Sequence, residues 1–151
     1  MISLQIAETI DKTEIADCKK NLVNAVKETL QQFGDVEPSD LTLVITNDEH
    51  MRQLNLQFRN IDSPTDVLAF PSRESDPDTG RRYLGDVLIS YPHALAQATT
   101  RGHSVQDELA LLVIHGVLHL LGFDHTNEAN KRRMWAAQNK ILDRLGFSIL
   151  G

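Results

Sequence analysis

Apolar residues recur along the first part of the chain with two different periods. Residues 2–7 alternate as in a short strand, with Ile2, Leu4 and Ile6 on one face. Residues 13–32 carry apolar side chains at helical spacing, with Thr13 as a candidate N-cap and Gly34 beyond the end. We therefore expect a strand followed by one long helix.

The middle of the chain alternates strand and helix signals. Residues 41–46 form an apolar run typical of a buried strand, and Asn47 can cap the helix that follows. This order predicts parallel strands joined by a right-handed crossover. Residues 67–70 form a strand flanked by prolines, which favour a sheet edge because proline donates no hydrogen bond to a ladder. A polar loop over residues 72–82 leads to a further strand over residues 83–90.

The last part of the chain is helical. Pro92 suits the first turn of a helix that extends to about Arg101. Ser104 can cap a helix whose residues 109–121 are apolar almost all round and which stops at Gly122, and another helix is expected over residues 127–145. The elements predict an α+β fold, with a small mixed sheet of about four strands and about five helices, in a single domain over residues 1–151.

The formal net charge of −6 is unevenly distributed. The first 50 residues hold ten acidic residues and four lysines, whereas residues 51–151 hold eleven residues of each sign, including all nine arginines. The overall charge argues against a protein that coats nucleic acid or anionic membranes through bulk attraction. It leaves room for a local electropositive cleft in the second part.

Cysteine content and hydropathy point to a reducing compartment. Cys18 is the single cysteine, which excludes an intramolecular disulfide, and its helical spacing with Leu22 predicts burial. No apolar run approaches the roughly 20 residues that span a bilayer, and the N-terminus does not resemble a signal peptide. We expect a cytoplasmic protein with no membrane partner.

Three of the six histidines lie within the segment HGVLHLLGFDH. His115 and His119 are one helical turn apart, so their rings project from the same face. Gly122 can adopt the left-handed conformation that ends a helix, and such a turn would bring His125 back toward the other two. Three neutral imidazoles leave a fourth position for water, as in a catalytic zinc site, although such sites also accept nickel, copper or iron.

A histidine on an apolar helix is usually a satisfied core residue, and a pair at this spacing can arise by accident. The third histidine beyond a helix-stopping glycine favours the metal-site interpretation, because charging three imidazoles in an apolar setting is costly. His50, His93 and His103 lack such a pattern, so we expect them to be solvent-facing or structural.

Gly116 occupies the position where metzincin proteases, which share this spacing, carry a glutamate as general base. Peptide hydrolysis is therefore disfavoured. Glycine inside a helix costs about 1 kcal/mol relative to alanine, which indicates a close approach to the backbone. Either helix packing or access of substrate would explain it.

Three segments together resemble one known family. HGVLHLLGFDH, LNLQFRNIDSPTDVLAFP (residues 54–71) and LGDVLIS (residues 84–90) are similar, in this order, to segments of the YbeY family of bacterial endoribonucleases. The resemblance implies a zincin-like fold and one metal ion, usually taken as zinc, on His115, His119 and His125. It also implies a functionally important arginine at Arg59, so Arg59 and His115 are the expected catalytic residues.

The same resemblance implies cleavage of single-stranded RNA, maturation of the 16S rRNA 3′ end and ribosome quality control. The expected partners are a 16S rRNA precursor and proteins of the small ribosomal subunit, with no DNA. A guanidinium suits this chemistry because it offers paired donors to phosphate and stays charged. Taken alone, Arg59 is an exposed arginine that complements a helix dipole.

Two other functions fit the histidine motif. One is a zinc peptidase or another small-molecule hydrolase, and the other is a non-enzymatic ribosome-assembly factor with a structural metal. Asp86 and Asp124 are weaker candidates, each either orienting a ligand histidine or pairing with an arginine.

Overall fold

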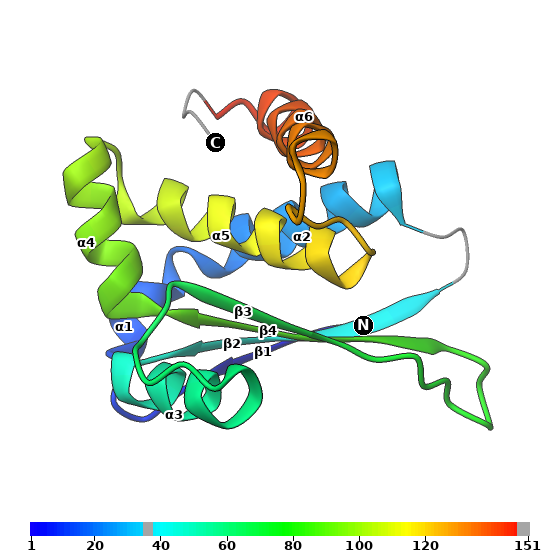
Figure 1. The fold of residues 1–151 in the computed structure, drawn as a ribbon, viewed down its shortest axis with the longest axis horizontal. Helices are drawn as coiled ribbons and strands as arrows, with labels where there is room; N and C mark the ends of the chain where they lie inside the picture. The colour runs from blue at the N-terminus through cyan, green and yellow to red at the C-terminus, as the bar shows by residue number, and fades with distance from the viewer. Residues whose placement is uncertain (35–37, 148–151) are drawn as a thin grey trace.

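The computed structural model describes residues 1–34 and 38–147. Its elements in chain order are β1 (Ile2–Ile6), α1 (Lys12–Ala16), α2 (Lys19–Phe33), β2 (Ser39–Thr46), α3 (Asp48–Arg59), β3 (Val67–Pro71), β4 (Arg82–Ser90), α4 (Tyr91–Arg101), α5 (Val105–Leu120) and α6 (Glu128–Leu145). The four-stranded sheet has the order β1-β2-β4-β3, in which β3 is the antiparallel edge strand (Figure 1). The α+β class and the edge position of β3 are confirmed.

The prediction of one helix over residues 13–32 is wrong. The helix breaks after Ala16, so the described part of the chain holds six helices rather than about five. Asp11, not Thr13, caps α1, since its carboxylate accepts a hydrogen bond from the Thr13 N–H at 2.9 Å. Cys18 lies at the break and is buried as predicted. Because the apolar spacing continues through the break, periodicity alone does not reveal it.

Helices α3 to α6 begin where polar side chains can cap them, whereas α2, which follows Cys18, has no side-chain cap. These side chains accept hydrogen bonds from backbone N–H groups in the first turn: Asn47 for α3, Ser90 for α4, Ser104 for α5 and Asn127 for α6. The predicted caps at Asn47 and Ser104 are confirmed.

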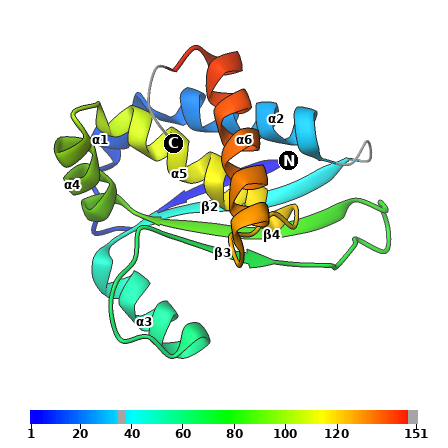
Figure 2. The same cartoon turned by 45° about the horizontal axis from the view of Figure 1, so that its top comes forward.

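Helices cover both faces of the sheet (Figures 1 and 2). Val87 and Ile89 of β4 face the main core, which α2, α5 and α6 complete. On the opposite face α3 packs over a smaller cluster of Met51, Leu68 and Leu88. Successive side chains of a strand point to opposite faces, so β3 and β4 contribute to both layers. Within residues 1–34 and 38–147, no helix is long and apolar enough to cross a membrane.

Candidate active site

The three histidines of the sequence motif converge at the C-terminal end of α5. One ring nitrogen from each of His115, His119 and His125 lies within 4.8 Å of the other two. The Nε2 atoms of His115 and His119 are 3.2 Å apart. The ring centroid of His125 lies 5.9 Å from that of His115 and 5.2 Å from that of His119. The predicted convergence of the three rings is confirmed.

A tight turn at Gly122 brings His125 to the other two histidines. The Gly122 N–H donates to the carbonyl of His119 at 3.0 Å, and the Phe123 N–H donates to the carbonyl of Leu118 at 3.0 Å. These two bonds form a Schellman motif, which needs a positive φ after the helix end. Gly122 supplies a φ of +102°, which a side chain would make costly.

The surroundings keep His115 and His119 neutral. Burial lowers the pKa of His115 below its usual value. Burial, followed by repulsion from the other two imidazoles, lowers the pKa of His119 to about 4. A neutral imidazole has a free lone pair on one ring nitrogen, and this is the form that binds a metal ion.

Gln138 on α6 selects the tautomer of His115. Its Oε1 atom lies 3.3 Å from Nδ1 of His115, and the glutamine is 3 % exposed. An amide oxygen only accepts, so Nδ1 carries the proton and the lone pair is on Nε2, the atom that faces His119. The buried glutamine therefore points the binding atom of His115 at the other histidines.

This donor set fits a transition-metal ion. Two nitrogens bound to one tetrahedral zinc at about 2.0–2.1 Å lie about 3.3 Å apart, close to the observed 3.2 Å between His115 and His119. Two Nε2 lone pairs this close repel each other unless a proton or a cation lies between them. Among the described residues the group has three ligands and no fourth, which leaves a position for water or substrate.

The histidines line one side of a cleft of about 680 Å³. Its other lining residues come from the end of α3, the following loop and the edge strand: Phe58, Arg59, Thr65, Asp66, Val67, Leu68, Ala69 and Phe70, with Gly116 beside the histidines. Arg59 is exposed, and no carboxylate of the described residues forms an ion pair with it. The guanidinium is therefore available to an anion bound in the cleft that Arg59 and the three histidines both line.

Gly116 allows α5 to lie close to the sheet. A Cβ atom added to it would come within 2.5 Å of Val87 Cγ1 and 3.3 Å of Val67 Cγ2. Helix packing therefore accounts for the glycine. Gly116 also lines the cleft, so the position bears on both of the explanations that the sequence left open.

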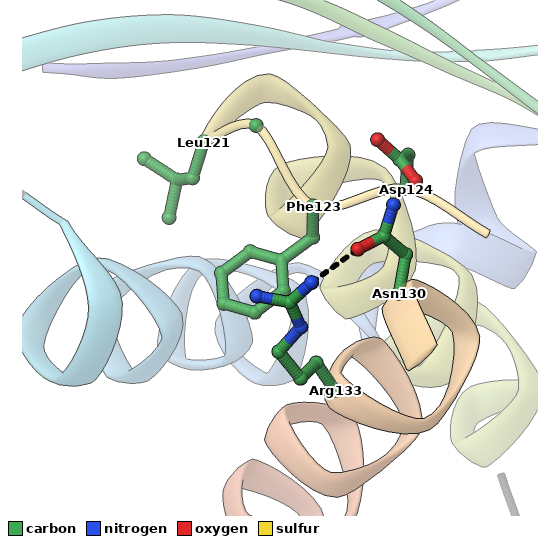
Figure 3. A pocket seen from close by; sticks show the side chains of 6 residues that line it. Leu121, Phe123, Asp124, Asn130 and Arg133 are labelled. Carbon is green, nitrogen blue, oxygen red and sulfur yellow. Dashed lines mark hydrogen bonds between the residues drawn. The ribbon is translucent and has the colours of Figure 1, made fainter. Parts of the chain in front are cut away.

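Asp124 lines a second, smaller cavity of about 220 Å³, which lies between residues 121–124 of the turn and Asn130 and Arg133 of α6. Figure 3 shows this lining, with Arg133 donating to Asn130. The Asp124 carboxylate accepts hydrogen bonds from the N–H and hydroxyl of Thr126, at 3.2 and 2.9 Å. It closes the turn before α6; within residues 1–34 and 38–147 it forms no hydrogen bond with a histidine ring and no ion pair with an arginine, although its charge acts on His119.

The remaining candidates lie outside the cleft. Asp86 accepts a hydrogen bond from the Tyr83 hydroxyl, and among the residues that the structure describes it bonds to no histidine ring and forms no ion pair with an arginine. His50, His93 and His103 bind Thr46, Asp48 and Glu108 respectively, which are structural contacts as expected.

Several residues of the site were not predicted from the sequence. Phe58 and Phe70 line the cleft, and Gln138 contacts His115. A signal for Gln138 was present, because it is a polar residue four positions after Met134 on the inward stripe of the last helix. Both phenylalanines lie in the segment of residues 54–71, but no pattern there marked them as cleft residues.

The chain is similar to known proteins over most of its length. The family described as Endoribonuclease YbeY matches residues 3–146. An Endoribonuclease YbeY from Synechococcus sp. (strain JA-2-3B'a(2-13)) is 49% identical over 119 residues, covering 75% of this chain and 73% of that protein. One from Roseiflexus castenholzii is 39% identical over 149 residues, covering 95% and 89%. The solution structure of TM1509 from Thermotoga maritima has a TM-score of 0.60 at 29% identity, covering 96% of this chain and 89% of that chain.

Proposed function

The chain belongs to the Endoribonuclease YbeY family and is an RNA-cleaving hydrolase, and on this basis we propose that it cuts single-stranded RNA with a zinc ion held by His115, His119 and His125. Its proposed substrate is the 16S rRNA precursor, cut during maturation of the 3′ end and in ribosome quality control. The proposed setting is the cytoplasm, with proteins of the small ribosomal subunit as partners.

One observation carries this proposal: Arg59 and the three histidines line the same cleft although they come from opposite faces of the sheet. When bound, the metal ion would supply Lewis acidity and lower the pKa of a bound water. The Arg59 guanidinium donates to the phosphate oxygens and stabilises the charge that develops on them. Gln138 holds the His115 ring in the orientation and tautomer that a ligand needs.

The alternatives are not favoured. A peptidase of this spacing would need a general base where the chain has Gly116. A structural zinc site normally has four protein ligands, whereas the described residues offer three.

Cleavage of a labelled single strand by the zinc-loaded protein tests the proposal. We expect His115→Ala to abolish cleavage and Arg59→Ala to reduce the rate by about 10²–10³-fold, as when one charge-stabilising donor is lost. Arg132→Ala, which removes an exposed arginine from α6, is the matched control and should cleave normally. Unchanged cleavage in both site variants would refute the proposal. Mapping the 3′ ends made from a 16S rRNA precursor tests the substrate.

A further inference from the structure

Two phenylalanine rings form the wall of the cleft on the α3 side. The ring centroids of Phe58 and Phe70 are 5.1 Å apart, with an interplanar angle of 60°. Phe70 packs against the small cluster beneath α3, whereas Phe58 is 59 % exposed. Phe70 therefore holds Phe58 in place while one side of the Phe58 ring remains open to the cleft.

The position of Phe58 distinguishes it from its exposed neighbours. Leu56 and Ile61 are also exposed, at 42 % and 44 %, but they do not line the cleft. Phe58 does, and the next residue is Arg59, whose guanidinium has no carboxylate partner among the described residues. An apolar ring and an unpaired cation are thus adjacent in the chain and face the same space.

A nucleotide presents the complementary pair of groups, a flat base and an anionic phosphate. Every base has a π-face, so stacking on an aromatic ring is sequence-tolerant. It is available only to unpaired bases, because both faces of a base inside a duplex are already covered. A protein partner would match the ring but leaves the adjacent unpaired cation unexplained.

We propose that Phe58, supported by Phe70, stacks an unpaired base of the RNA beside the phosphate that Arg59 contacts. The inference rests on the function proposed above and adds to it a residue that selects single strands. Phe58 then contributes to binding and to the choice of substrate, while the histidines and Arg59 serve the cleaved bond.

Base stacking can be measured directly with a short single-stranded RNA that carries 2-aminopurine, whose fluorescence is quenched when it stacks. The zinc-loaded protein is mixed rapidly with this RNA, and the quenching is recorded before cleavage. We expect Phe58→Leu, which keeps an apolar side chain without a π-face, to lose the quenching and to weaken binding by about 5- to 100-fold. Phe58→Trp should retain both.

Leu56→Ala is the matched control, because Leu56 is exposed on the same helix outside the cleft. It should bind and quench like the unaltered protein. For Phe58→Leu the ratio of single-strand to duplex cleavage should also fall, since duplex RNA offers no free base to stack.

Two outcomes would overturn the inference, and they differ in what they say about the proposed function. If Phe58→Leu quenches and binds normally while His115→Ala fails to cleave, the function stands, base stacking is refuted, and the exposed ring is left to a protein partner. If the unaltered protein neither binds nor cleaves single-stranded RNA, the proposed function and the inference fail together.

Discussion

Nδ1 of His115 and Oε1 of Gln138 lie 3.3 Å apart, in a contact that joins α5 to α6. The chain leaves α5 after the first two histidines, turns at Gly122, passes His125 and returns along α6 to reach the far side of the first ring. Helix α6, which follows the histidine motif, therefore fixes the orientation of His115, the first histidine of that motif.

Replacing Gln138 with leucine should weaken metal binding without unfolding the protein. Loss of a hydrogen-bond partner behind a metal-binding histidine typically costs about 10–100-fold in affinity. Competition with a chromogenic zinc chelator measures this change. Asn139→Leu, an exposed position on the same helix, is the control and should bind zinc normally. Equal affinities in Gln138→Leu and the unaltered protein would show that the contact does not orient the ligand.

Without metal, the protein should lose stability as the pH falls from about 6.5 to about 4. Over this range the unfolded chain takes up a proton on His119 that the folded protein does not, because the pKa of His119 is lowered to about 4. His115, whose pKa is also lowered by burial, adds to the loss just below the pKa of an unfolded histidine. The slope of the unfolding free energy against pH is at most about 1.4 kcal/mol per pH unit for each histidine. It falls to zero above the pKa of a histidine in the unfolded chain, about 6.5.

Urea unfolding of chelator-treated protein at several pH values gives this slope. The double variant His115→Gln, His119→Gln lacks both titrating groups and should show a shallower dependence. An identical slope in the double variant would contradict the assignment.

A methyl group at position 116 should force α5 away from the sheet. In Gly116→Ala the new Cβ would approach Val87 Cγ1 to 2.5 Å, and overpacking of this kind typically costs about 1–3 kcal/mol of unfolding free energy. Because Val87 supplies the contact, Val87→Ala should relieve most of this cost. Chemical denaturation of the two single variants and the double variant measures the coupling. Strictly additive losses would mean that the two positions do not interact.

Removing a partner of the buried Glu108 carboxylate should destabilise the protein more than removing the carboxylate charge itself. Glu108 is fully buried and binds Arg101 Nη1 at 2.8 Å and His103 Nε2 at 2.5 Å. Arg101→Ala removes the arginine partner of the buried carboxylate and leaves only His103 beside it. This loss should lower the free energy of unfolding by about 3 kcal/mol. Glu108→Gln removes the charge and leaves a guanidinium that reaches solvent, so it should cost less. Thermal and urea unfolding of both variants give the order, and the reverse order would refute this account.

Most of the fold was predictable because each element has a local cause. Asn47 and Ser104 cap their helices, and prolines keep the strand that ends at Pro71 at the sheet edge. The break after Ala16 was not predictable from apolar spacing, since Cys18 continues the inward stripe across it. A capping carboxylate at Asp11 was the local sign of an earlier helix start.

The histidine cluster was predictable because all three histidines lie on one helix and the turn that ends it. The approach of Arg59 depends on tertiary structure, since α3 and α5 pack on different faces of the sheet and meet only around its edge. Only the family resemblance singled out Arg59. The pairing of Phe58 with Phe70 has the same long-range origin and left no trace in the spacing of the sequence.

The two walls of the cleft are anchored with unequal strength. His115 and His119 lie on α5, which runs through the main core, and His125 follows the turn that ends this helix. Phe58 and Arg59 depend instead on α3, whose buried support is the small cluster around Met51. Elements with few buried contacts open first, so α3 can detach while α5 and the turn at Gly122 stay in place. A protein whose α3 has opened would therefore keep its three histidines together, so the proposed metal site and the proposed RNA-binding wall can form as separate steps.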